Sequence, residues 1–91
     1  MNIFDALELY RKRKTINRLL PYGCDLMTAK YLLYAMHYDL CLINAALLED
    51  MTETGLYMCL DRLHFSIYEL DDYEKEVLIE YCLNKILKSS G

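Results

Sequence analysis

The chain has 91 residues, of which 55% are apolar, only 3 are Gly and 1 is Pro. This length fits one folded domain, and this composition excludes a largely disordered chain. Turn-forming residues are too few for a protein of many β-strands. The net charge of −4 is divided unevenly, with +3 over residues 1–20 and −7 over residues 21–91. An acidic body of this kind argues against broad binding to a nucleic-acid backbone.

The first predicted helix occupies the N-terminal segment and ends before residues 21–23. Asn2 is suited to cap this helix, because its side chain accepts hydrogen bonds from a first turn. Apolar residues then follow at helical spacing, namely Ile3, Phe4, Leu7 and Tyr10, and later Ile16, Leu19 and Leu20. Pro21 and Gly23 mark the clearest break in the chain.

A long helix is predicted from Met27 to Leu48, with Asp25 or Thr28 as its cap. One apolar stripe comprises Met27, Tyr31, Tyr34, Tyr38, Cys41, Ala45 and Leu48. A second stripe on the nearly opposite side comprises Ala29, Leu33, Met36, Leu40, Ile43 and Leu47, with Lys30, His37 and Asn44 between the two. Such a helix is typical of the centre of a small bundle, unless one stripe meets a partner.

The remaining segment predicts two or three shorter helices. Asp50 or Thr52 is suited to cap a helix through Leu56 and Leu63, and Ser66 with Glu69 again has the spacing of a capping box. The last helix is expected to start around Asp71 and Asp72, whose charges suit a helix N-terminus. The sequence therefore predicts an all-α, compact bundle of four to five helices, forming a single domain over residues 1–91.

The sequence carries no recognisable catalytic group. The chain has no Gly-rich phosphate loop, and no nucleophile lies in a local pattern with a base. The acidic group at Glu69, Asp71, Asp72, Glu74 and Glu76 is explained as a solvated helix start. We therefore expect no enzyme and no cofactor.

A metal site is not expected either. His37 and Cys41 are four residues apart, which suits a zinc pair on one helix face. Cys59 and His64, however, are five apart, which turns the two side chains about 140° from each other on a helix. The four cysteines, at positions 24, 41, 59 and 82, are expected to be reduced residues of the core.

The N-terminus has neither the basic region nor the apolar region of a signal peptide, and no uncharged stretch approaches the length of a membrane span. The expectation is an intracellular, cytoplasmic protein, in a host cell if it is encoded by a virus, with no membrane contact.

Tyrosine is over-used, with 9 Tyr against 2 Phe and no Trp. Tyrosine favours positions where the ring is buried and the hydroxyl reaches solvent, and it is enriched in protein interfaces. The predicted stripe of Tyr31, Tyr34 and Tyr38 is either core, with hydroxyls reaching the surface, or a surface for a partner. Further interface candidates on the next helix are Tyr57, Glu53 and Asp61.

A basic patch lies in the first helix and comprises Arg11, Lys12, Arg13, Lys14 and Arg18. Three interpretations remain open: contact with nucleic acid, contact with an acidic protein, and a solvated helix face. Arg11, Lys14 and Arg18 share one side of a helix, at spacings of three, four and seven.

Residues 45–65 read A-A-L-L-E-D-M-T-E-T-G-L-Y-M-C-L-D-R-L-H-F. This segment resembles the helix-turn-helix of the Fis and NtrC-type regulators, with its apolar positions at Ala45, Ala46, Met51, Leu56, Leu60, Leu63 and Phe65. The resemblance implies a recognition helix over residues 52–64, supported by a helix that ends over residues 45–49. It also implies binding to DNA.

Two functions follow from these patterns. The favoured hypothesis is a small non-catalytic regulator, adaptor or inhibitor, of the kind that viruses and phages encode, which acts through a protein partner or as a homodimer. The alternative is a DNA-binding helix-turn-helix regulator that uses the basic patch. The acidic residues Glu53 and Asp61 stand where related DNA readers carry Arg and Lys, which favours the first hypothesis.

Overall fold

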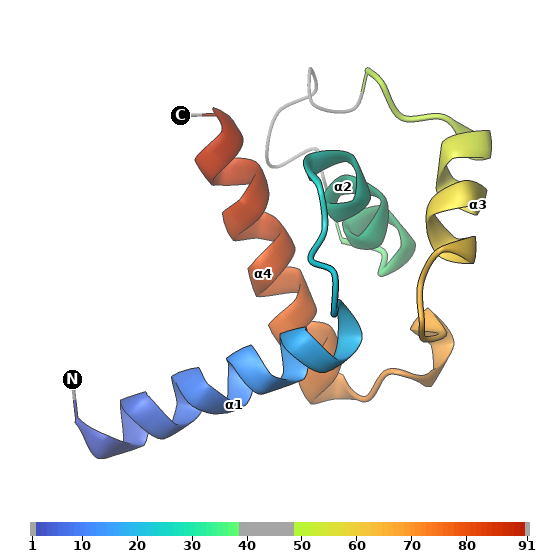
Figure 1. The fold of residues 1–91 in the computed structure, drawn as a ribbon. Coiled ribbons are helices and arrows are strands. Elements are labelled where there is room, and N and C mark those ends of the chain that lie inside the picture. The colour runs from blue at the N-terminus through green and yellow to red at the C-terminus, as the bar shows by residue number, and fades with distance from the viewer. Residues whose placement is uncertain (1, 39–48, 91) are drawn as a thin grey trace.

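The structure, a computed structural model, describes residues 2–38 and 49–90. These residues contain the helices α1 (Ile3–Leu19), α2 (Leu26–Ala35), α3 (Glu53–Asp61) and α4 (Asp72–Ser90), and the 3-10 turn η3 (Ile67–Glu69). No strand occurs in the described part of the chain. The prediction of an all-α bundle is therefore confirmed (Figure 1).

The core lies mainly between α2 and α4, which share the most extensive contact of the described elements. Helix α2 is central, with α4 on one side and α3 on the other, and α1 crosses the first half of α4 (Figure 1). The largest fully buried side chains are Leu32 and Leu33 of α2 and Leu78, Cys82 and Ile86 of α4. Burial of these side chains supplies the main driving force for folding.

Side chains cap the first three helices where the sequence suggests. Asn2 Oδ1 accepts a hydrogen bond from the Asp5 N–H at 2.9 Å, which confirms the predicted cap of α1. Of the two alternatives at α2, the cap is Asp25, which accepts from the Thr28 N–H at 2.8 Å. At α3 the cap is Thr52 and not Asp50.

The predicted long helix from Met27 to Leu48 is wrong, because α2 ends at Ala35. His37 adopts a left-handed backbone conformation, with a φ of 61°. The Tyr38 N–H donates to the Leu33 carbonyl at 2.9 Å and the His37 N–H donates to the Tyr34 carbonyl at 3.0 Å. These two bonds form a Schellman motif, which terminates a helix. The rest of both stripes, over residues 39–48, lies outside the described residues.

The predicted capping box of Ser66 and Glu69 is also wrong. Ser66 precedes η3, but its side chain makes no capping hydrogen bond. The turn is closed instead by a backbone bond from the Glu69 N–H to the Ser66 carbonyl at 3.0 Å.

Replacing His37 with glycine is expected to stabilise the protein by about 1 kcal/mol, because glycine adopts positive φ without the steric cost of a side chain. Urea unfolding of the variant and the parent measures this change. His64→Gly is a control at an exposed histidine that lacks positive φ, and it should not stabilise. A loss of stability in His37→Gly would contradict the assigned role of this turn.

Candidate functional site

The N-terminal half of α1 projects beyond α4 into solvent (Figure 1). Its large apolar side chains are mostly exposed, with fractions of 70% for Ile3, 77% for Phe4, 56% for Leu7 and 63% for Tyr10. We call these four residues the α1 stripe. An apolar patch of this kind at one end of a helix is a common mark of an interaction site.

Three residues of the α1 stripe lie opposite positions of α1 that contact the body of the protein. Residues nine apart on a helix point in opposite directions, because each residue adds about 100°. Ile3 is nine positions before Lys12, which pairs with Glu80 of α4. Leu7 and Tyr10 are nine positions before Ile16 and Leu19, which pack against the core or within it. The side of α1 that carries Lys12, Ile16 and Leu19 therefore contacts the body. Arg11 and Arg18, four and eleven residues after Leu7, are on the side of Leu7 and also reach α4.

Side chains of α4 hold three members of the basic patch. Lys12 Nζ donates to Glu80 Oε2 at 3.0 Å, and Arg18 donates to Glu74 Oε2 at 2.6 Å. The Arg11 guanidinium lies 4.6 Å from the ring centroid of Tyr73, a cation–π contact. The basic patch thus serves largely to dock α1 on α4, which none of its three sequence interpretations included.

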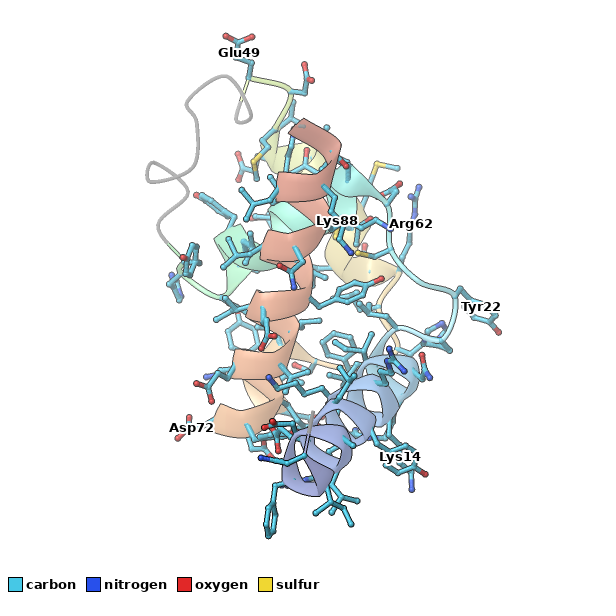
Figure 2. The ribbon with its side chains drawn as sticks, turned by 90° about the vertical axis from the view of Figure 1, so that its left-hand side faces the viewer. Lys14, Tyr22, Glu49, Arg62, Asp72 and Lys88 are labelled. Carbon is cyan, nitrogen blue, oxygen red and sulfur yellow. The ribbon has the colours of Figure 1, made fainter. Side chains whose placement is uncertain are left out.

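The other two members of the basic patch, Arg13 and Lys14, are exposed and form no ion pair with the described residues. Lys14 lies 6.0 Å from the ring of Tyr10, beside the α1 stripe. Figure 2 shows its side chain on the side of α1 remote from Asp72. One cation of the basic patch, Lys14, therefore borders the apolar surface.

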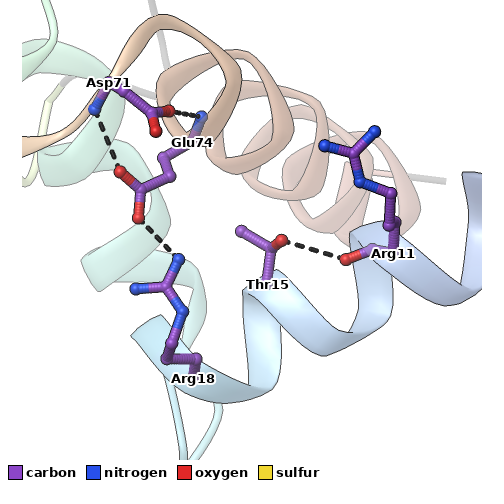
Figure 3. Close-up of polar contacts among 5 residues, drawn as sticks. All are labelled: Arg11, Thr15, Arg18, Asp71 and Glu74. Carbon is purple, nitrogen blue, oxygen red and sulfur yellow. Dashed lines mark hydrogen bonds and ion pairs between the residues drawn. The ribbon is translucent and has the colours of Figure 1, made fainter.

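Glu74 joins the start of α4 to the end of α1 (Figure 3). Its Oε1 accepts from the Asp71 N–H at 3.0 Å, while the Glu74 N–H donates to Asp71 Oδ1 at 2.7 Å. This reciprocal pair is a capping box, and it confirms the predicted start of the last helix. The other oxygen binds Arg18. The backbone hydrogen bond from Asp71, followed by that from Arg18, holds the pKa of Glu74 below its ordinary value of 4.5.

Because the pKa of Glu74 is lowered by folding, its contribution to stability is present above pH 4.5 and is lost as the pH falls through the lower, folded-state value. We expect Glu74→Gln to be less stable than the parent at neutral pH and to lose less stability on acidification. Urea unfolding between about pH 2 and pH 7 measures both effects. Glu76→Gln, at an exposed position of the same helix, is the matched control. Parallel pH profiles for Glu74→Gln and the parent would contradict the prediction.

The predicted tyrosine stripe does not form one surface. Tyr31 is buried, with an exposed fraction of 5%, and its hydroxyl accepts from the Thr52 N–H at 3.0 Å. Tyr38 is half buried and packs against the core, whereas Tyr34 is 57% exposed. A partner at this surface would therefore reach Tyr34 but not Tyr31.

The three interface candidates of α3 do lie together at the surface. Tyr57 is 59% exposed, and its hydroxyl donates to Glu53 Oε1 at 3.4 Å. Asp61 is also exposed. Since α3 and the projecting end of α1 lie at opposite ends of the view in Figure 1, these residues form a surface separate from the α1 stripe.

The predicted recognition helix over residues 52–64 corresponds to α3, which is shorter because it ends at Asp61. Residues 45–48 of the predicted supporting helix lie outside the described residues.

Cys41, which the sequence pairs with His37 as a possible zinc ligand, also lies outside the described residues. No group of three or more His, Cys, Asp or Glu side chains in residues 2–38 and 49–90 is placed to hold a metal ion. In the same residues, no helix combines the length and the apolar character that crossing a bilayer requires.

No protein-family model matches the chain, and no match was found among curated proteins or solved structures. The sequence pattern assigned the α1 stripe and the apolar residues 16–20 to one apolar face of the first helix. The spacing distinguishes the two groups, because Ile3, Leu7 and Tyr10 are each nine residues before a position that contacts the body.

Proposed function

We propose that this protein is a non-catalytic, protein-binding regulator that inserts the α1 stripe into an apolar groove of a partner protein with acidic residues at its rim. The observation that carries the proposal is the exposure of Ile3, Phe4, Leu7 and Tyr10 on the half of α1 that projects beyond α4. Ile3, Leu7 and Tyr10 are at positions i, i+4 and i+7 of the spacing used in helix-in-groove recognition, and Phe4 is three residues before Leu7.

The docking of α1 supports this role. A helix that folds only on binding loses conformational freedom at that step, which weakens the complex. The pairs of Lys12 with Glu80 and of Arg18 with Glu74 hold the C-terminal half of α1 on α4. The α1 stripe is therefore presented on a helix that is already formed and oriented.

The charge beside the α1 stripe supports an acidic rim on the partner. Lys14 is exposed beside Tyr10 and adds positive charge at the edge of the α1 stripe. Complementary charges at a rim raise the rate of association and favour one orientation. Rim charges contribute less to affinity than a buried aromatic or aliphatic anchor, so Phe4 and Leu7 should dominate the binding energy.

The partner can be identified by placing a photo-crosslinking amino acid at Leu7 in cells of the native host. Tyr68 is a suitable control position because it is 93% exposed and lies in η3, outside α1. We expect a partner that crosslinks from position 7 and not from position 68.

Binding of the purified partner then tests the α1 stripe. Leu7→Glu is expected to weaken affinity by about 30-fold, equivalent to about 2 kcal/mol, while Tyr68→Glu leaves it unchanged. Circular dichroism should show the same helix content in both variants. Equal affinities of Leu7→Glu and the parent would contradict the proposal.

Two further measurements address the other hypotheses. A concentration-dependent dimer in analytical ultracentrifugation that Leu7→Glu abolishes would make a second copy of the chain the occupant. Binding to duplex DNA that weakens steeply with rising salt, and that Leu7→Glu leaves intact, would favour the DNA-binding alternative.

A further inference from the structure

Three cysteines from distant parts of the sequence meet beside one cavity. Cys24 lies in the connection between α1 and α2, Cys59 in α3 and Cys82 in α4, and all three are free thiols. The cavity has a volume of about 560 Å³, and Cys24 and Cys59 line it. A cavity of this volume accommodates a small organic molecule.

Charged side chains at the cavity favour an anionic guest. Arg62 and Lys85 line its wall, opposed by one carboxylate, that of Asp25. The rings of Tyr22 and His64, with centroids 5.7 Å apart, also line it. Figure 2 shows Tyr22 and Arg62 on the same side of the molecule.

The three thiols differ in accessibility and in their neighbours. Cys24 is half buried, whereas Cys82 is fully buried, with an exposed fraction of 0%. Cys24 packs against the core cluster that contains Cys82. Interaction with the Cys82 thiol lowers the pKa of the Cys24 thiol, and the nearby Lys85 adds to the effect. Burial instead raises the pKa of the Cys59 thiol.

Because a thiolate is the attacking species in thiol–disulfide exchange, these surroundings make Cys24 the most reactive of the three. Cys82 follows as its partner, because it lies against Cys24 and is shielded from solvent. Cys59 lines the same cavity but keeps its proton.

We propose that Cys24 is a modification site for small anionic disulfides, of the class of glutathione disulfide, and that Cys82 resolves the product to an internal Cys24–Cys82 disulfide. The Cys24 thiolate attacks one sulfur of the small disulfide, a mixed disulfide forms, and the first small thiolate leaves and takes up a proton. Cys82 then loses its proton and attacks the Cys24 sulfur, and the second small thiolate leaves. Two protein thiols and one small disulfide thus give one protein disulfide and two small thiols.

The first step prepares the second. The mixed disulfide forms beside Cys82, because Cys24 packs against the core cluster that contains Cys82. The resulting disulfide ties the connection before α2 to the middle of α4.

The experiment uses the full chain with Cys41→Ser, so that the remaining thiols are the three described ones. Glutathione disulfide is added to the folded protein, and intact mass and peptide mapping follow the products. We expect a loss of two hydrogen atoms, mapped to a Cys24–Cys82 bond. Cys82→Ser should accumulate the mixed disulfide on Cys24, Cys24→Ser should stay reduced, and Cys59→Ser should behave as the parent.

Two comparisons test the roles of the fold and of the cavity charge. In denaturant the shorter loop between Cys59 and Cys82 favours their pairing, so the preference for Cys24–Cys82 should disappear. Cystamine, a cationic disulfide, should react about tenfold more slowly than glutathione disulfide, and Lys85→Gln should reduce this difference.

Circular dichroism of each reduced variant checks that the helices are kept. A parent that stays reduced would overturn the proposal, as would modification of Cys59 in place of Cys24 in the folded chain. Equal rates for the two probes would overturn the assigned preference for anions.

Discussion

Replacing Gly55 with alanine is expected to destabilise the protein by about 2 kcal/mol, although the same change inside a helix normally stabilises by about 1 kcal/mol. Gly55 lies in the first turn of α3, where α3 packs against Tyr31 of α2. An added Cβ would clash with the Tyr31 hydroxyl and would lie 2.8 Å from Tyr31 Cζ and 3.0 Å from Thr52 Oγ1. Since Tyr31 is buried and bonded to the Thr52 N–H, its ring has little room to retreat.

Chemical denaturation of Gly55→Ala measures the loss. Thr54→Ala, at the neighbouring exposed position, is the matched control and should be neutral or slightly stabilising. Adding Tyr31→Phe to Gly55→Ala removes the hydroxyl and should recover part of the loss, which a double-mutant cycle would report as coupling. A Gly55→Ala variant as stable as the parent would show that α3 does not approach α2 this closely.

Leu78→Ala is expected to have the largest effect of any single truncation considered, with a loss of about 3 kcal/mol. Leu78 has an exposed fraction of 0% and lies in α4, the helix that shares the main contact with α2. Truncation removes buried apolar surface and leaves a cavity, because close-packed neighbours relax only partly. A domain of this size has little stability in reserve, so a substantial unfolded fraction is expected at 37 °C.

Leu7→Ala is the matched control for Leu78→Ala, because it is the same substitution at a side chain that is 56% exposed. Thermal and urea unfolding should show little change for Leu7→Ala and a large decrease for Leu78→Ala. The same pair separates stability from function, because only Leu7→Ala should weaken partner binding in a fully folded protein. Similar losses of stability in both variants would place Leu7 in the core and remove the basis of the proposed function.

Local signals in the sequence predicted most of the secondary structure. The caps at Asn2 and Asp71 and the break at Pro21 act within a few residues, so they can be recognised without a fold. The end of α2 was missed because it depends on a left-handed turn at His37, where glycine is the usual signal. An apolar pattern that continued past this residue favoured a helix that was too long.

The candidate sites were harder to predict, because they depend on tertiary contacts. The charge of Arg18 is visible in the sequence, but its pairing with Glu74, 56 positions away, is not. The meeting of Cys24 with Cys82 likewise requires α4 to lie beside the connection that precedes α2. Only the opposition of Ile3, Leu7 and Tyr10 to Lys12, Ile16 and Leu19 could be read from the sequence, since it is a property of one helix.

The shallow attachment of α1 has a consequence for local opening. Leu19 is the only residue of α1 that is buried, and surface ion pairs supply much of the remaining contact. Surface pairs contribute little free energy and weaken with salt, so the helix can detach while the α2–α4 core stays folded. Amide protons of α1 should therefore exchange with solvent faster than those of α4. A partner bound to the α1 stripe would slow that exchange and leave the core unchanged, so hydrogen exchange would report occupancy of the α1 stripe.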